Sequence, residues 1–107
     1  MSQPDWNELV KKAQEMQSRM AQVQQDLARR SVEASSGGGM VTAVATGELR
    51  IREIRIEPAL LEGDDRAMLQ DLVAAAVNAA LAAAQRMVQE EMQRVAGQAT
   101  MNLRPAE

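Results

Sequence analysis

The groups that could do chemistry in this 107-residue chain are lysines, arginines and carboxylates, because the sequence has no histidine and no cysteine. The commonest general base, the thiol nucleophile and most transition-metal ligands are therefore missing. Four carboxylates crowd one short segment and could hold a hard cation: Glu57, Glu62, Asp64 and Asp65. Their spacing is not that of an EF-hand, and capping of a helix start explains two of them. We predict no catalytic residue, no metal site, no cofactor and no enzyme activity.

A serine- and glycine-rich segment, residues 35–39, could suggest a loop that cradles a phosphate. A P-loop needs Gly-x-x-x-x-Gly-Lys-Ser/Thr after a buried strand, whereas these glycines join two segments typical of short strands. We therefore predict a hairpin turn here.

Basic side chains are the remaining candidates for binding, and they fall into three small sets. One predicted strand carries one set with only Glu53 opposing it, and two predicted helices carry the others. In a dimer each set would appear twice, so modest patches could hold duplex DNA through phosphate contacts with little base readout. The alternative is that these charges only solvate the surface. The candidate phosphate-binding residues are Lys11, Lys12, Arg19, Arg50, Arg52, Arg55, Arg86 and Arg94.

The overall charge is acidic and unevenly distributed. The net charge is −3 and the isoelectric point is about 5.0, so the dominant basic field that usually marks a nucleic-acid binder is absent. Residues 1–56 hold eight Lys or Arg against seven Asp or Glu, and residues 57–107 hold four against eight. The excess of acid therefore belongs to the C-terminal half.

A long helix is predicted near the N-terminus, up to about Arg30. Its apolar residues from Trp6 to Leu27 recur at alternating spacings of three and four, which is typical of a coiled-coil seam. Ser2 as a cap, with Asp5 three residues later, is typical of a helix start.

A second long helix is predicted over about residues 64–96, which contain no Gly or Pro. Asp64 or Asp65 suits its positive end as a cap, and Gly97 is a typical stop signal. Apolar residues again recur at spacings of three and four. Many are alanines, which let a partner backbone approach closely.

Between the helices, over residues 31–57, the apolar period changes from 3.6 to 2, which predicts three short strands. We expect a type II′ turn at Gly47-Glu48, because glycine accepts a positive φ. A change of apolar phase predicts a bulge near Arg52–Glu53, and Pro58 ends the third strand.

The fold class that follows is α+β, in the order α-β-β-β-α, with a three-stranded antiparallel sheet and two long helices. We predict one domain over residues 1–97 and a flexible tail over residues 98–107. Strands of about seven residues span about 23 Å, whereas the helices are about 39 and 50 Å long, so the sheet covers only part of each apolar face.

An obligate homodimer would cover the remaining apolar surface. We expect Asn78 to be a hydrogen-bonded register residue in its seam. In a monomer, five residues of the overhang should stay exposed: Met16, Met20, Leu81, Met87 and Val88. The predicted interface residues are Met16, Met20, Val73, Val77, Asn78, Leu81, Met87 and Val88.

The chain is expected to be soluble and cytoplasmic, with no membrane partner. No signal-peptide-like apolar run opens it, and Asn78, Gln85 and Arg86 interrupt the alanine-rich helix. The lack of cysteine fits a reducing compartment.

Three segments of the chain resemble a known family: KKAQEMQSRM at residues 11–20, GGMVTAVATGELRIREIRIEPALL at residues 38–61, and MLQDLVAAAVNAA at residues 68–80. Together with the order α-β-β-β-α, they make the chain similar to the YbaB/EbfC family of bacterial nucleoid-associated proteins over about residues 9–95. In one departure from the family pattern, Thr46 replaces the Asn that is usual before Gly47.

The resemblance implies a small homodimer of the cytoplasm and nucleoid, tweezer-shaped with helical arms, that binds DNA with little or no catalytic chemistry. Family members are often encoded beside replication and recombination genes, which suggests chromosome organisation or repair. The family motif places basic residues at Lys11 and Arg19, so these are the first candidates for phosphate contact.

The leading hypothesis is a homodimer that binds duplex DNA through helix-borne Lys and Arg without strong sequence preference. The alternative is a helical scaffold or adaptor that docks onto replication or recombination proteins and binds DNA weakly or not at all. A small helical chaperone is a third possibility.

Overall fold

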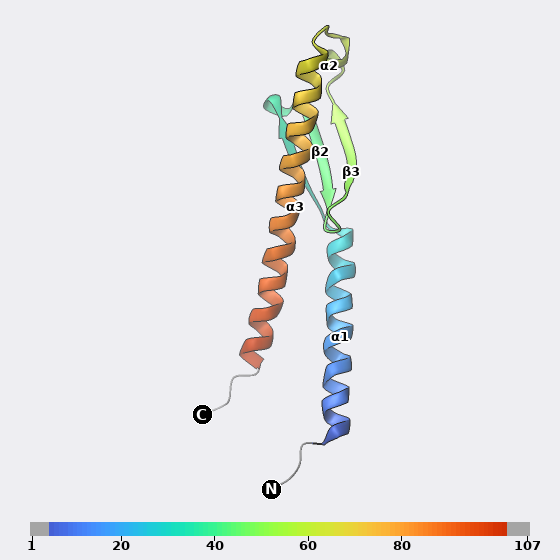
Figure 1. The fold of residues 1–107 in the computed structure, drawn as a ribbon, viewed down its shortest axis with the longest axis vertical. Helices are drawn as coiled ribbons and strands as arrows, with labels where there is room; N and C mark the ends of the chain where they lie inside the picture. Colours follow the sequence, from blue (N-terminus) through green and yellow to red (C-terminus); the bar gives the residue numbers. More distant parts are fainter. Residues whose placement is uncertain (1–4, 103–107) are drawn as a thin grey trace.

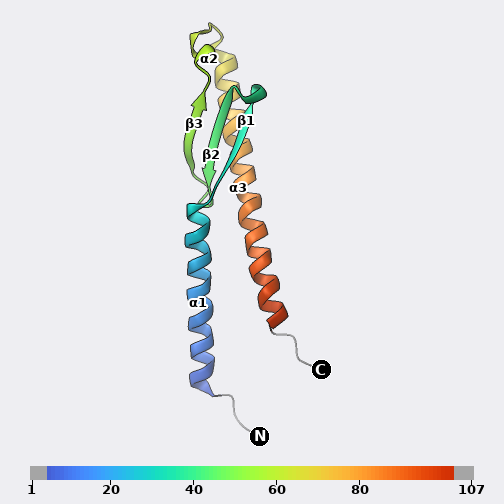
Figure 2. The same ribbon diagram turned by 180° about the vertical axis from the view of Figure 1, so that it is seen from behind.

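The computed structural model describes residues 5–102 of the chain, with side chains as far as Gly97. Figures 1 and 2 show an elongated molecule, 79 × 25 × 15 Å in extent, with a small sheet at one end and two helical arms at the other. Along the chain the elements are α1 (Trp6–Arg29), β1 (Ser31–Ser36), the 3-10 turn η1 (Gly37–Gly39), β2 (Val41–Thr46), β3 (Ile51–Ile56), α2 (Pro58–Glu62) and α3 (Arg66–Asn102). The predicted order α-β-β-β-α is confirmed, and α2 adds a single helical turn.

Both long helices begin with an aspartate cap. The carboxylate of Asp5 accepts a hydrogen bond from the backbone N–H of Asn7 at 3.1 Å, so α1 begins at Trp6. Ser2 lies outside the described residues, but the predicted place of Asp5 inside the first turn is wrong, because its backbone is extended (φ −66°, ψ 116°) and Asp5 is itself the cap. At α3 the carboxylate of Asp65 accepts from the N–H of Met68 at 2.9 Å, which confirms Asp65 as the cap.

The predicted end of the second helix at Gly97 is wrong, because α3 continues to Asn102. A glycine inside a helix costs only about 1 kcal/mol, and the next proline is Pro105. The predicted boundary between domain and tail therefore falls inside the helix. Residues 103–107 of the expected tail lie outside the described residues.

The sheet is an antiparallel meander in the order β1-β2-β3. The segment Gly37–Gly39 forms the predicted hairpin turn, with all three glycines at positive φ. Val44 pairs with Glu53, but its neighbour Ala45 pairs with Ile51, so Arg52 is the extra residue of a bulge. The bulge predicted near Arg52–Glu53 is confirmed.

The turn between β2 and β3 differs from the predicted type II′ turn. Its left-handed residue is Leu49, at φ 64°, and not Gly47. The N–H of Leu49 donates to the carbonyl oxygen of Thr46 at 2.9 Å, and the Thr46 hydroxyl accepts from the N–H of Glu48 at 3.3 Å. Glycine fits position 47 because of close packing: a Cβ there would lie 2.1 Å from the carbonyl oxygen of Leu27.

The core lies between the sheet and α3, which packs on β1 and β2 and scarcely on β3. Its fully buried residues are small: Val41, Ala43 and Ala45 of β2, and Ala76, Ala80 and Ala84 of α3. Small side chains on both sides let the helix backbone approach the sheet closely. The inner face of β3 stays partly uncovered as a result, and Ile54 is exposed there.

Helix α1 is attached to the rest of the molecule at its C-terminal end. Within α1 only Leu27 is buried, with 4% of its surface exposed. Just after the helix, the carbonyl oxygen of Arg30 accepts a hydrogen bond from the N–H of Gly47 at 3.2 Å. Farther along the arm the predicted seam is open to solvent, and Trp6 is 74% exposed. In proteins most of a helix's stability comes from packing of its apolar face, and the single chain buries that face of α1 only near its C-terminal end.

The described part of α3, from Arg66 to Gly97, is long and apolar enough to cross a membrane by length and composition alone. Core helices of soluble proteins pass the same test, and Ala76, Ala80 and Ala84 of this helix are core residues. Length and composition therefore do not assign α3 to a membrane.

Candidate nucleic-acid interface

The basic residues of α1 lie on an arm that projects away from the sheet (Figures 1 and 2). Lys11, Lys12 and Arg19 are exposed, and none of them forms an ion pair within residues 5–97. Glu15 lies four residues from both Lys11 and Arg19, which places it on the same side of the helix. Glu8 lies three and four residues from Lys11 and Lys12 in the same way. The arm therefore offers three free cations to a phosphate, with two carboxylates among them.

Arg55 of β3 is neutralised within its own sheet. Its guanidinium donates to the Glu33 carboxylate at 2.7 Å and to the Glu53 carboxylate at 3.0 Å. These hydrogen bonds, first that to Glu33 and then that to Glu53, raise the pKa of Arg55 above its ordinary value. Glu33 and Glu53 flank Val44 in the strand register, and Val44 is 6% exposed although α3 does not cover this face. Arg55 thus bridges the outer strands and is not a free cation.

The other predicted cations of the sheet and of α3 have different surroundings from Arg55. Arg50 and Arg52 near the β2–β3 turn, and Arg86 on α3, are exposed and form no ion pair among the described side chains. These residues remain available to a ligand. The eight predicted cations do not form one patch, because they are distributed over α1, the end of the β2–β3 turn, β3 and α3.

Arg94 of α3 is engaged with Glu91, three residues earlier on the same helix. Both Nε and Nη2 of Arg94 donate to the Glu91 carboxylate, and Nη1 of Arg30 lies 3.6 Å from Glu91 Oε2. Hydrogen bonding from Arg94 holds the pKa of Glu91 below its ordinary value, and the same contact raises the pKa of Arg94. Arg30, the residue that follows α1, therefore joins the end of α1 to α3.

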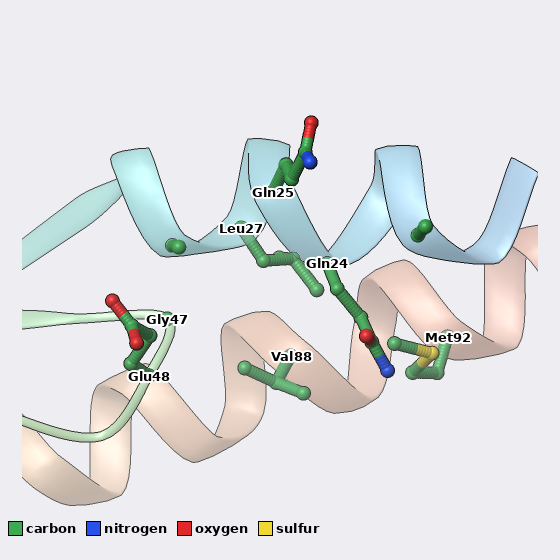
Figure 3. A pocket seen from close by; sticks show the side chains of 9 residues that line it. Gln24, Gln25, Leu27, Gly47, Glu48, Val88 and Met92 are labelled. Carbon is green, nitrogen blue, oxygen red and sulfur yellow. The ribbon is translucent and has the colours of Figure 1, made fainter. Parts of the chain in front are cut away.

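A hollow of about 540 Å³ lies between the two arms near their root. Figure 3 shows Leu27 of α1 pointing toward α3, and Gln24 lying beside Met92. Val88 and Met92 line the α3 side, and no basic residue lines the hollow. The hollow continues the apolar seam of α1 and lacks the charges of a phosphate site.

The predicted dimer-interface residues have different exposures in the single chain. Met16 and Met20 on α1 are exposed, and Val73, Val77, Leu81 and Val88 on α3 are half-buried. Asn78 is exposed, and it lies two residues from each of the buried core residues Ala76 and Ala80. Residues two apart do not share a helix face, so Asn78 points away from the sheet.

Met87 corrects one expectation, because it is 7% exposed and so is buried by its own chain. It follows Ala80 and Ala84 at helical spacings of seven and three, which places it on the face of α3 that is turned to the core. The monomer therefore already covers this side chain, and it partly covers Leu81 and Val88, which were also expected to stay exposed.

The acidic excess of the chain lies at the α2 end, away from the free ends of the arms (Figure 1). Residues 57–71 contain five carboxylates and one arginine, Arg66, all of them exposed. Within the described residues no group of three acidic side chains is arranged to hold a metal ion. The low isoelectric point therefore reflects one end of the molecule more than the arms.

Several known proteins are similar to this chain in sequence. The sequence profile of the YbaB/EbfC DNA-binding family matches residues 2–99. A nucleoid-associated protein of Acetivibrio thermocellus is 53% identical over 91 residues, covering 85% of this chain and 80% of that protein. The chain belongs to the YbaB/EbfC DNA-binding family. A second relative, a nucleoid-associated protein of Ruminiclostridium cellulolyticum, is 46% identical over 91 residues, covering 85% of this chain and 79% of that one.

The YbaB/EbfC fold is also found in a solved structure. The crystal structure of an uncharacterized protein from Helicobacter pylori superposes with a TM-score of 0.73 at 22% sequence identity, covering 87% of this chain and 98% of that one. At this identity the match supports the fold. The predicted α+β class, with a three-stranded sheet and two long helices, is confirmed.

Sequence reasoning missed the residues that neutralise two of the eight predicted cations in this YbaB/EbfC member. Glu33 lies on β1, far from Arg55 in sequence, and only the strand register brings the two together. The pair Glu91 and Arg94 could have been found from its helical spacing of three residues. The contact between Arg30 and Glu91 could not have been found in this way, because it depends on how the end of α1 lies against α3 in the folded chain.

Proposed function

We propose that the protein is a nucleoid-associated homodimer that binds duplex DNA through phosphate contacts, with little sequence specificity, in the cytoplasm at the nucleoid. Its role would be in chromosome organisation or repair. The observation that carries the proposal is the separation of charge: free cations lie on the α1 arm, and the acidic excess lies at the α2 end. Family membership supports DNA as the ligand.

The phosphate-binding groups in this proposal are the cations without an intramolecular partner. Lys11, Lys12 and Arg19 lead, and Arg50, Arg52 and Arg86 are secondary. Exposed lysines and arginines that contact phosphates position DNA without reading its bases. We therefore infer binding that depends steeply on salt and little on sequence.

A second copy of the chain is the partner that the uncovered apolar surface favours. The half-buried residues Val77 and Leu81 of α3 and the exposed Ile54 of β3 belong to apolar surface beside the core that the single chain leaves uncovered. The open edge of β3 could pair with another strand. Pairing here would double the arm cations, and sedimentation at low micromolar concentration tests it, because a stable folded monomer would contradict the dimer.

The test of DNA binding compares two charge reversals of equal size. Arg19→Glu changes the arm, whereas Arg66→Glu changes an exposed arginine at the acidic end. Each lost phosphate contact lowers the magnitude of the slope of log K against log salt by about 0.9. In a dimer, Arg19→Glu should therefore lower the slope by about 1.8 and weaken binding, with Arg66→Glu close to wild type.

Fluorescence anisotropy with a labelled duplex at several salt concentrations gives both slopes. The dimer must be shown intact for each variant. No binding by the wild type at about 50 mM salt, where counterion release most favours association, would refute DNA binding for this protein.

A second candidate function is a helical scaffold for replication or recombination proteins. The open apolar seam of α1, from Trp6 to Met20, favours it, because exposed apolar stripes mark interfaces. Recovery of the same protein partners before and after nuclease treatment, with loss of recovery in Met16→Ser, would support this function over DNA binding.

A further inference from the structure

Two arginines from different parts of the chain converge on one carboxylate where the arms meet. Arg94 binds Glu91 through Nε, at 3.3 Å from Oε2, and through Nη2 to Oε1. Arg30, at the end of α1, places Nη1 3.6 Å from Glu91 Oε2. The Glu91 side chain is only 17% exposed, whereas those of both arginines are more than half exposed.

Glu91 stands at a position where the helix pattern favours an apolar residue. It follows Ala84 and Met87 at spacings of seven and four, and both of those residues are buried on the core face of α3. A carboxylate that is mostly removed from water is costly unless it is paired. Arg30 and Arg94 supply that pairing.

A guanidinium that binds a carboxylate through two N–H groups can bind a phosphate in the same way. We propose that Arg30 and Arg94 form a phosphate site at the root of the arms, which Glu91 fills as an internal counter-ion. The ligand is a phosphate group of the DNA backbone, which must displace Glu91 to bind. Glu91 thus lowers the affinity for DNA, and this inference rests on the proposed function.

The chain provides a matched control for this site in the next residue. Glu90 is exposed and forms no ion pair among the described side chains. Glu90→Gln and Glu91→Gln therefore change the net charge equally, on the same helix turn. Only Glu91→Gln frees the two arginines.

Duplex affinity and its salt slope should be measured for the wild type and both variants. Glu90→Gln should raise affinity by less than about twofold. Glu91→Gln should raise it by about three- to tenfold, and each arginine that becomes available to a phosphate should steepen the slope by about 0.9. Adding Arg94→Gln to Glu91→Gln should cancel the gain. Equal affinities for Glu90→Gln and Glu91→Gln would overturn the inference.

A measurement without DNA separates this inference from the proposed function. Inorganic phosphate titrated into the protein should shift the NMR signal of the Arg94 Nε–H at lower concentration in Glu91→Gln than in the wild type. A shift in this variant without any duplex binding supports the phosphate site and refutes the DNA-binding proposal. No shift in Glu91→Gln overturns the site, even where duplex DNA binds.

If Glu91→Gln does not fold, the arginines can be tested in the wild-type background. Arg30→Gln and Arg94→Gln should each weaken duplex binding more than Arg66→Gln, which removes an arginine at the α2 end. Equal losses in all three variants would overturn the inference.

Discussion

Replacing Gly47 with alanine should loosen the attachment of α1 to the sheet. The new Cβ would lie 2.1 Å from the carbonyl oxygen of Leu27 and 2.6 Å from its carbonyl carbon. Heavy atoms in favourable contact are about 3.5 Å apart or more, so the end of α1 or the β2–β3 turn must move by more than about 1 Å. Gly47 does not have a positive φ, so the cost comes from this collision.

The size of the effect follows from what that movement breaks. The hydrogen bond from the Gly47 N–H to the carbonyl oxygen of Arg30, at 3.2 Å, contributes about 0.5–1.5 kcal/mol. Leu27 is 4% exposed, and loss of most of its burial costs about 1.5–3 kcal/mol. Gly47→Ala should therefore lower the free energy of unfolding by about 2–4 kcal/mol.

Gly97→Ala is the matched control, because the same substitution should raise the free energy of unfolding there. Nothing lies within 4 Å of a Cβ built on Gly97, which is inside α3, and replacing a helical glycine with alanine stabilises by about 0.5–1 kcal/mol. Urea unfolding at one protein concentration compares the two variants with the wild type. Hydrogen exchange should show faster exchange of α1 amides in Gly47→Ala. A Gly47→Ala protein as stable as the wild type, with α1 equally protected, would refute the packing argument.

Three further predictions concern charge. Glu15→Gln should strengthen duplex binding by about two- to fivefold, because Glu15 lies on the same side of the helix as Lys11 and Arg19. Titration followed by fluorescence anisotropy measures this, and an unchanged affinity would contradict it. Arg55→Gln should weaken duplex binding less than Arg52→Gln, because Glu33 and Glu53 already neutralise Arg55. A larger loss of duplex affinity for Arg55→Gln in the same titration would contradict this prediction. The pKa of Glu91 is lowered in the folded protein from its ordinary value of 4.5, so its stabilising contribution is present above that pH and is lost as the pH falls through the folded pKa. The difference in Tm between wild type and Glu91→Gln should therefore be larger at pH 7 than at pH 3, and a difference independent of pH would contradict the ion pairs.

The fold could be predicted from the sequence where a local pattern decides the structure. The alternation of residues 41–46, the glycines at 37–39 and the shift of apolar phase around Arg52 each specify a strand, a turn or a bulge within a few residues. The type of the β2–β3 turn was missed because Gly47 is required by the approach of Leu27, a residue 20 positions away. The end of α3 was missed because one glycine is too weak a signal to stop a helix.

The candidate site was less predictable than the fold, because the sequence gives the positions of charges but not their partners. Lys11, Lys12 and Arg19 are exposed, as their helical positions predict. Arg55 is neutralised through the pairing of three strands. These pairings are set by tertiary structure, so counting cations along the chain overestimates what a phosphate can use.

The same reasoning explains how a chain with an isoelectric point of about 5.0 can be proposed to bind DNA. Phosphates respond to the charges within about a Debye length, roughly 8 Å at physiological salt, and the molecule is 79 Å long. The carboxylates of residues 57–71 at the α2 end are too far from the arm tips to cancel Lys11 and Lys12 there, although Glu8 and Glu15 are not. Net charge is therefore a poor guide for an elongated protein, and the carboxylates that matter are those beside the arm cations. On this argument Glu8, Glu15 and Glu91 have more influence on DNA affinity than all the acidic residues at the α2 end together.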